Sequence, residues 1–288
     1  MHYADYKTIL SPKNGMNLYR GCTHGCIYCD SRSVCYQIKH GFEDIEVKRG
    51  ADRILEAQLR ARRSPCMIAT GSMCDPYIPL EEELELTRRC LEVIERCGFG
   101  LSILTKSARI LRDIDLLCAI NERAKCVAMM TLTTFDEALC RVLEPGVSTT
   151  EERVSALIEL GNAGIPTVVW ISPILPFIND TQENLLGLLD RCALAGVRGI
   201  ICFGFGTTMR EGSREYFYAK LDEFFPGMKE RYIRSFGSAY SCESPASARL
   251  TEIFRAECEK RGLEHRQTRV FDYIRAFETN WAQLTMFD

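Results

Sequence analysis

The chain has 288 residues, of which 46% are hydrophobic and 26% charged, and its net charge is −3. This composition is typical of a globular protein with one large domain or two small ones. The small net charge excludes a strong overall attraction to nucleic acid or to a membrane surface. It does not describe how the charges are distributed, so a local basic patch is compatible with it. Apolar runs end well short of about 18 residues, so we expect no membrane-spanning helix.

Fifteen cysteines would suit a disulfide-rich secreted protein. However, residues 1–10 lack the apolar core of a signal peptide, and a chain of this length needs no disulfides to fold. Most cysteines outside the N-terminal motif fall in apolar runs, where they are interpreted as buried, reduced thiols. We therefore expect a cytoplasmic protein.

Short apolar runs alternate with amphipathic segments through the first half of the chain. Leu86, Cys90, Val93 and Cys97 recur at helical spacing, which predicts one continuous helix over 80–97. The continuous apolar runs favour strands of a parallel sheet that helices cover. The predicted elements are a strand at 16–20, a helix at 51–63, a strand at 66–70, the helix at 80–97, a strand at 100–105, a helix at 110–121 and a strand at 126–133.

The alternation continues in the second half. Thr149 and Glu152 form the pattern of a capping box, which predicts a helix that begins there and ends at Leu160. Asp180 and Glu183 form the same pattern and predict the start of another helix. The remaining predicted elements are strands at 167–171 and 197–203 and a helix near 213–224.

About six strand-then-helix units therefore lie between residues 16 and 225. Such units form either an open doubly wound sheet or a partial barrel, and their spacing does not separate the two. Both architectures place functional loops at the carboxyl ends of the strands. Residues 226–288 change to a helical pattern, clearest at 246–261. We predict an α/β domain at 1–225 and a helical cap at 226–288 that selects the substrate.

The loop after the first predicted strand holds the densest group of soft metal ligands. Cys22, Cys26 and Cys29 are separated by three and two residues, and thiolates suit iron–sulfur clusters and zinc. A [4Fe–4S] cluster is usually held by four cysteines, so three would leave one iron open to another ligand. A structural zinc needs four closed ligands. The nearby candidates for a fourth ligand have no familiar zinc spacing and are His24, Cys35 and His40.

This motif, at the end of the first strand of a repeated β/α protein, resembles that of the radical S-adenosylmethionine superfamily. Later segments at predicted strand ends resemble the spore-photoproduct-lyase-like branch of the superfamily and occur in the same order. The resemblance covers roughly residues 15–205. The segments are Gly71–Tyr77, Leu104–Ser107, Thr131–Thr134, Leu143–Pro145 with Arg153, and Ser172–Pro176 with Asn179–Asp180.

The resemblance implies a partial (β/α)6 barrel with a [4Fe–4S] cluster and S-adenosylmethionine as cofactors. It implies that Cys22, Cys26 and Cys29 ligate the cluster and that the open iron chelates S-adenosylmethionine. An electron donor such as flavodoxin or ferredoxin would then drive cleavage of the cofactor. The resulting 5′-deoxyadenosyl radical would abstract hydrogen from a substrate, while the protein positions the reactants and excludes water.

Further cofactor contacts are implied at the strand ends. Gly71 and Ser72 match the segment that binds the methionine amino group, and Lys106 suits the methionine carboxylate. Tyr28 would pack beside the adenine, although an aromatic residue here also fits the core. Without a partner, Lys106 would be an ordinary surface lysine.

Three other residues are implied as cofactor contacts, each with a structural alternative. Thr131 and Thr133 would bond the ribose hydroxyls, but β-branched residues are also plain strand formers. Arg153 would bind a carboxylate or form a salt bridge with Glu144 or Glu151.

One segment departs from the pattern of the branch. The lyase carries a hydrogen-donating cysteine at the second strand end, within the sequence Cys-Thr-Ser-Asp. Alignment on Asp75 places Ser72 at the position of that cysteine and puts a thiol two residues later, at Cys74. Cys74 as a reactive thiol and Asp75 as an orienting group are our candidate catalytic residues, and each also fits a buried or turn position. The departure puts repair of DNA dimers in doubt.

We expect a radical enzyme whose substrate is unidentified and whose type (lyase, oxidoreductase or transferase) is open. Repair of a nucleic-acid photoproduct competes with modification of a peptide, a protein or RNA. DNA is weakly supported, because Arg60, Arg62 and Arg63 lack the interleaved aromatic residues of a stacking surface. The contrasting hypothesis is a non-catalytic binding module that zinc or an iron–sulfur cluster stabilises.

Overall fold

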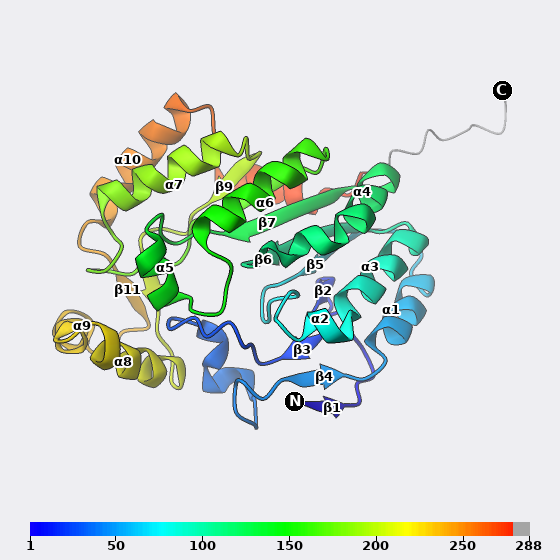
Figure 1. Ribbon diagram of the computed structural model, residues 1–288, viewed down its shortest axis with the longest axis horizontal. Helices are drawn as coiled ribbons and strands as arrows, with labels where there is room; N and C mark the ends of the chain where they lie inside the picture. The colour runs from blue at the N-terminus through cyan, green and yellow to red at the C-terminus, as the bar shows by residue number, and fades with distance from the viewer. Residues whose placement is uncertain (279–288) are drawn as a thin grey trace.

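A six-stranded parallel sheet forms the centre of the protein, whose computed structural model describes residues 1–278 (Figure 1). The strands follow one another across the sheet in chain order, without the reversal of a doubly wound sheet. The sequence left two architectures open, and this order is that of the predicted partial (β/α)6 barrel. In spatial order the strands are β2 (Gly15–Met16), β5 (Met67–Thr70), β6 (Gly100–Thr105), β7 (Cys126–Thr131), β8 (Thr167–Trp170) and β9 (Gly199–Ile201).

Helices cover the outer face of this sheet (Figure 1). Their apolar stripes meet outward-facing strand residues in one large core, in which Leu91, Ile103 and Leu157 are fully buried. None of the helices in residues 1–278 is long and apolar enough to cross a membrane. The helices of this part are α1 (Ala51–Arg60), α2 (Glu81–Leu84), α3 (Leu86–Cys97), α4 (Ile114–Arg123), α5 (Glu137–Leu143), α6 (Thr150–Asn162) and α7 (Gln182–Leu194).

A small second sheet divides the strand that was predicted at 16–20. Met16 ends β2 of the main sheet, whereas Tyr19 begins a strand of the small sheet, which leads directly into the cysteine loop. The order of the small sheet is β1-β4-β3, with β4 parallel to β1 and antiparallel to β3. Its strands are β1 (His2–Ala4), β3 (Tyr19–Arg20) and β4 (Glu46–Lys48), and the short 3-10 helices η1 (Asp30–Arg32) and η2 (Val34–Tyr36) follow the loop.

The C-terminal part packs on both faces of the sheet. Alternate residues of a strand face opposite sides, and Val127 and Met129 of β7 face inward. Val270 and Ile274 of the last helix pack against them, so this helix fills the inner face of the partial barrel. The elements after β9 are β10 (Gly206–Thr208), α8 (Ser213–Phe224), α9 (Met228–Phe236), β11 (Ser241–Glu243), α10 (Ser247–Lys260), which packs on α7, and α11 (Gln267–Arg275). Residues 279–288 of the predicted cap lie outside the described residues.

The continuous helix predicted at 80–97 is wrong, because the chain forms two helices there. Glu85 between α2 and α3 has a left-handed backbone with a φ of 47°. Glu81 explains the break: its buried carboxylate accepts a hydrogen bond from the Thr87 N–H at 2.8 Å, in the first turn of α3. The Glu81 side chain therefore accepts the hydrogen bond of a first-turn N–H, which in a continuous helix would bond a carbonyl of the preceding turn.

Two other predicted helix starts also differ from the structure. The segment predicted as helical from residue 110 begins as the 3-10 helix η3 (Ala108–Asp113), before α4. The cap predicted at Asp180 is wrong by one residue, because Thr181 caps α7 and accepts a hydrogen bond from the Asn184 N–H at 3.1 Å. Asp180 instead accepts a hydrogen bond from the Ser244 hydroxyl.

The capping box predicted at Thr149 is confirmed. The Thr149 hydroxyl accepts a hydrogen bond from the Glu152 N–H at 3.2 Å, and the Glu152 carboxylate accepts one from the Thr149 N–H at 2.7 Å. Both first-turn N–H groups are thereby satisfied at the start of α6.

We expect Thr181→Ala to lower the free energy of unfolding by about 1 kcal/mol, since it removes the cap of α7. Urea denaturation of the purified protein measures this change. Thr181→Ser keeps the hydroxyl and should retain the stability. Glu183→Ala, which removes the glutamate of the wrongly predicted box, should change it by less than about 0.5 kcal/mol. A larger effect of Glu183→Ala than of Thr181→Ala would contradict this assignment.

Candidate cofactor-binding site

A cavity of about 700 Å³ opens at the carboxyl ends of the parallel strands. The ends of β5 to β9 line it, together with the cysteine loop and the β10–β11 pair. This is the end of a β/α barrel at which ligands bind, and the volume suits a cofactor with part of a substrate. The lining residues that matter below are Cys26, Tyr28, Cys29, Ser72, Lys106, Trp170 and Phe203.

Backbone contacts hold the cysteine loop, which has no regular secondary structure. The Cys22 N–H donates to the Phe42 carbonyl at 3.1 Å, and the Ile27 N–H donates to the Leu143 carbonyl at 2.9 Å. Gly21 has a φ of 89°, and a Cβ there would lie 2.3 Å from the Phe42 oxygen. Only glycine therefore allows the loop to approach so closely.

Two of the three predicted ligands line one end of the cavity, and the third lies beside them. Cys26 and Cys29 are the two in the lining, and Cys22 neighbours both them and Cys74. The thiol of Cys74 lowers the pKa of Cys22 to about 6, whereas burial raises the pKa of Cys26 and of Cys29. Metals bind the thiolate form, so a bound metal would displace the protons of Cys26 and Cys29. A set of three neighbouring thiols fits an iron–sulfur cluster.

Lys106 presents an uncompensated positive charge to this end of the cavity. Its ammonium nitrogen lies 5.9 Å from the centre of the Tyr28 ring. Burial opposes the charge, yet Cys26 and Glu144 raise the pKa of Lys106 above its ordinary value. Within residues 1–278 its side chain makes no ion pair. A carboxylate in the cavity would satisfy this charge, and S-adenosylmethionine carries one.

Asp75 fixes the cysteine loop to the neighbouring strand ends. It lies 3.2 Å from Nε2 of His24 and accepts a hydrogen bond from the Thr105 hydroxyl at 2.6 Å. Burial opposes the charge of Asp75, but His24 holds its pKa at about 2, and Asp75 in turn raises the pKa of His24 to about 8. The other ring nitrogen of His24 bonds the Gly146 carbonyl at 2.9 Å. Asp75 thus connects the cysteine loop, through His24, to the end of β6.

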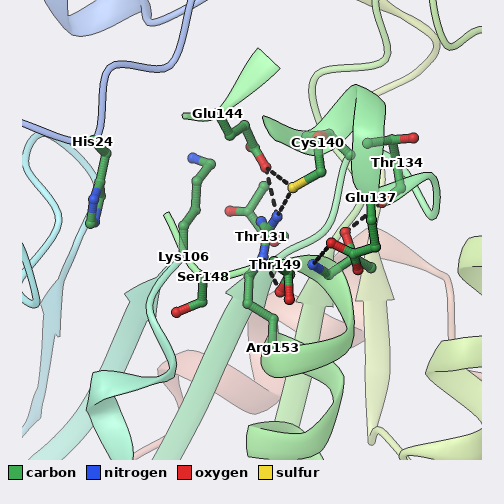
Figure 2. Close-up of polar contacts among 12 residues, drawn as sticks. His24, Lys106, Thr131, Thr134, Glu137, Cys140, Glu144, Ser148, Thr149 and Arg153 are labelled. Carbon is green, nitrogen blue, oxygen red and sulfur yellow. Dashed lines mark hydrogen bonds and ion pairs between the residues drawn. The ribbon is translucent and has the colours of Figure 1, made fainter. Parts of the chain in front are cut away.

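A buried ion pair lies behind the cavity wall. Figure 2 shows Arg153 reaching from its helix to Glu144, at 2.7 Å, and to the backbone of Thr131, whose carbonyl accepts at 2.6 Å. The Tyr28 hydroxyl donates to the same Glu144 carboxylate. Burial opposes the charge of Glu144, but Arg153 holds its pKa below the ordinary value. Of the alternatives for Arg153, its salt bridge with Glu144 is present.

The structure separates the predicted site residues into two groups. Those that line the cavity are Cys26, Tyr28, Cys29, Gly71, Ser72, Lys106 and Thr131. Those outside the lining are the half-buried Cys22 and Asp75 and the buried Cys74, Thr133 and Arg153. Cys74 is 6% exposed and contacts Cys22, so its thiol is not brought to the cavity. The Thr133 hydroxyl is buried and has no hydrogen-bond partner among the described residues.

Two aromatic residues of the lining were missed by the sequence reasoning. Trp170 ends β8 and Phe203 follows β9, and their ring centres are 5.4 Å apart. Phe203 is 57% exposed, and Phe271 of α11 packs against both rings. Trp170 and Phe203 both lie at the ends of predicted strands, and this position alone could have marked them as residues of the site. The helix α5 was also missed, although Asp136 caps it by accepting hydrogen bonds from its first turn.

Comparison with known proteins identifies related sequences. Residues 16–192 match the sequence model of the Radical SAM superfamily. An uncharacterized protein of Mycobacterium tuberculosis is 30% identical over 230 residues, which cover 75% of this chain and 65% of the relative. Another, of Methanocaldococcus jannaschii, is 32% identical over 171 residues, covering 58% and 62%. The chain thus spans less than two thirds of the length of these relatives.

Solved structures show the same fold. Spore photoproduct lyase complexed with dinucleoside spore photoproduct is similar with a TM-score of 0.60 and 15% identity, covering 84% of this chain and 72% of the lyase. A mutant of the lyase gives a TM-score of 0.62 at 16% identity. This likeness confirms the partial barrel.

We expect Glu144→Ala to lower the free energy of unfolding by about 3–5 kcal/mol, because Arg153 is left as a buried charge without its partner. Chemical denaturation followed by circular dichroism measures the loss. Glu151→Ala is a matched control, since its ion pair with Arg191 lies at the surface and contributes about 1 kcal/mol or less. Equal losses of unfolding free energy in the two variants would show that the buried pair contributes no more to stability than a surface pair.

Proposed function

The chain belongs to the radical S-adenosylmethionine superfamily, and we propose that it abstracts hydrogen from a substrate bound between its cysteine loop and the Trp170–Phe203 wall. Membership implies an enzyme with two cofactors, a [4Fe–4S] cluster and S-adenosylmethionine. The observation that carries the proposal is that Cys26, Cys29 and Lys106 line one cavity, with Cys22 next to the two thiols.

Cys22, Cys26 and Cys29 would hold the cluster as thiolates. When reduced, the bound cluster supplies the electron that cleaves S-adenosylmethionine to a 5′-deoxyadenosyl radical. Lys106 would bind the methionine carboxylate, because it is the cation of the cavity lining that lacks an ion-pair partner within residues 1–278. We assign the reduction of the cluster to a partner such as flavodoxin or ferredoxin.

The second strand end would bind the methionine amino group through Gly71 and Ser72. Gly71 has a φ of 95°, and a Cβ there would lie 1.8 Å from the Leu104 carbonyl oxygen. A glycine is therefore required for the backbone to turn out of β5 and face the cavity. Ser72 is exposed and lines the cavity.

Tyr28 and Thr131 would contact the nucleoside part of the cofactor. Glu144 fixes the Tyr28 hydroxyl, and Arg153 fixes the Thr131 carbonyl. Thr133 and Arg153, which lie behind the wall, would act on this part of the site through the strand end. The residues of the lining are thus held before a ligand arrives, which lowers the cost of ordering them on binding.

The far wall of the cavity supports a substrate with a planar group, because Trp170 and Phe203 offer aromatic faces there. A nucleobase of a photoproduct and an aromatic group of a peptide both meet this condition. The position of Cys74 favours modification over repair, since the thiol lies behind Cys22 rather than beside the substrate space. Cys26 and Cys29 are the thiols of the lining within the described residues.

We expect the protein, reconstituted without oxygen, to bind about four irons and to form 5′-deoxyadenosine when reduced. Chromatography of the nucleoside and iron analysis measure both. Cys29→Ala should abolish nucleoside formation, whereas Cys118→Ala, at a cysteine outside the cavity lining, should leave it unchanged. If the protein is a non-catalytic binding module, no variant will form the nucleoside. Undiminished cleavage of S-adenosylmethionine by Cys29→Ala would refute our proposal.

We expect Lys106→Met to weaken S-adenosylmethionine binding about 10- to 100-fold, the effect of losing a hydrogen-bonded charge. Equilibrium binding to the reconstituted protein measures the dissociation constant, and the iron content should be retained. Lys106→Arg should bind more tightly than Lys106→Met. Lys7→Met, at an exposed lysine outside the lining, is the control for a general loss of charge. If Lys106→Met bound S-adenosylmethionine with wild-type affinity, Lys106 would not be a cofactor-binding residue.

A further inference from the structure

A second group of metal-binding side chains lies outside the cavity, on the small sheet. His2 belongs to β1, and His40 and Asp44 belong to the segment that precedes β4. The ligand atoms of these three residues all lie within 4.8 Å of one another. The small sheet is at the lower edge of Figure 1, beside the N-terminus. None of the three lines the cavity.

The hydrogen bonds of His40 leave one ring nitrogen free for a metal. Nδ1 of His40 lies 2.9 Å from the Gly41 carbonyl, which can only accept, so Nδ1 carries the proton. In the neutral ring Nε2 then offers a lone pair. This nitrogen is buried and has no hydrogen-bond partner among the described residues. Histidines that bind metals commonly donate their other N–H to a backbone carbonyl in this way.

Two carboxylates face the two imidazoles. Nδ1 of His2 lies 3.1 Å from Asp44, and its Nε2 lies 3.6 Å from Oε2 of Glu46. The same Glu46 oxygen lies 3.8 Å from Nε2 of His40. These last two distances are too long for hydrogen bonds. They are close to the separation of about 3.3–3.5 Å between ligands of a tetrahedral metal with bonds of about 2.0–2.1 Å.

The rest of the surroundings leaves this Glu46 oxygen available. The other oxygen of Glu46 accepts a hydrogen bond from the Tyr6 hydroxyl and lies 4.0 Å from Nε of Arg20. Asp44 also pairs with the amino group of Met1 at 3.0 Å. Each of the two carboxylates thus has one cation beside it, Arg20 at Glu46 and the Met1 amino group at Asp44.

We propose that His2, His40 and Asp44, with Glu46 as a fourth donor, bind one divalent first-row cation, for which zinc is the best fit. Two imidazole nitrogens with carboxylate oxygens are borderline ligands that suit zinc, whereas magnesium and calcium prefer oxygen alone. The absence of sulfur from the group separates this site chemically from the cysteine loop.

The metal would connect the N-terminal strand to the support of the cysteine loop. His40 and Asp44 flank Phe42, whose carbonyl accepts the hydrogen bond from the Cys22 N–H. Phe42 also sets the close approach of the chain at Gly21. A cation between β1 and the segment 40–44 would therefore hold in place the carbonyl on which the first ligand cysteine rests.

The experiment uses the reconstituted protein with its iron–sulfur cluster and zinc as the probe. We expect about one zinc per chain by elemental analysis, in addition to the iron. X-ray absorption at the zinc edge should show nitrogen and oxygen ligands at about 2.0–2.2 Å and no sulfur near 2.3 Å. Sulfur ligands would mean that zinc occupies the cysteine loop, and a protein that takes up no zinc would equally overturn the site.

Variants test the ligands individually. We expect His40→Gln and His2→Gln each to weaken zinc binding more than tenfold, while the protein still takes up its iron. His265→Gln, on the loop before α11, is the matched control and should bind zinc like the wild type. Two positions on different segments keep the test decisive if one variant does not fold. Wild-type zinc affinity in either folded variant would refute the proposal. Zinc and iron are counted separately, so this outcome is independent of cleavage activity.

Discussion

The ion pair between Glu144 and Arg153 connects the two halves of the site. Both side chains are almost fully buried, and burying two charges is costly unless each is paired and hydrogen-bonded. Both side chains make further hydrogen bonds. Glu144 also accepts one from the Tyr28 hydroxyl of the cysteine loop, and Arg153 also donates one to the Thr131 carbonyl at the end of β7. The pair therefore ties an irregular loop to a rigid strand, at a point where main-chain ladders cannot do so.

Asp75 performs a similar task on the other side of the loop. It bonds His24 within the loop and Thr105 at the end of β6. Asp75 and Glu144 thus each fix one residue of the cysteine loop, His24 and Tyr28 respectively. They also raise the pKa of Lys106, which keeps its ammonium charged beside the cavity. The same acidic groups that position the loop therefore maintain the positive charge that faces a ligand.

The sequence predicted the sheet well, because a buried parallel strand needs a continuous apolar run that few other elements produce. It predicted the cysteine loop from the spacing of its thiols. It failed where a hydrogen bond from a side chain to the backbone decides local structure. Glu81 breaks the helix at Glu85 through a bond to Thr87, and no periodicity within 80–97 reveals this. The sequence offered Glu144 as a partner of Arg153, but it could not show that Arg153 is buried in that pair while Lys106 faces the cavity.

The packing of α11 supports the aromatic side of the cavity. Val270 and Ile274 close the inner face of β7 and β8, and Phe271 lies against the Trp170 and Phe203 rings. α11 therefore fills the inner face of the sheet directly behind the two aromatic rings that line the cavity. On the proposed function, a cofactor against the cysteine loop and a substrate against these rings would share one cavity, so a rigid α11 would keep the two at a fixed separation.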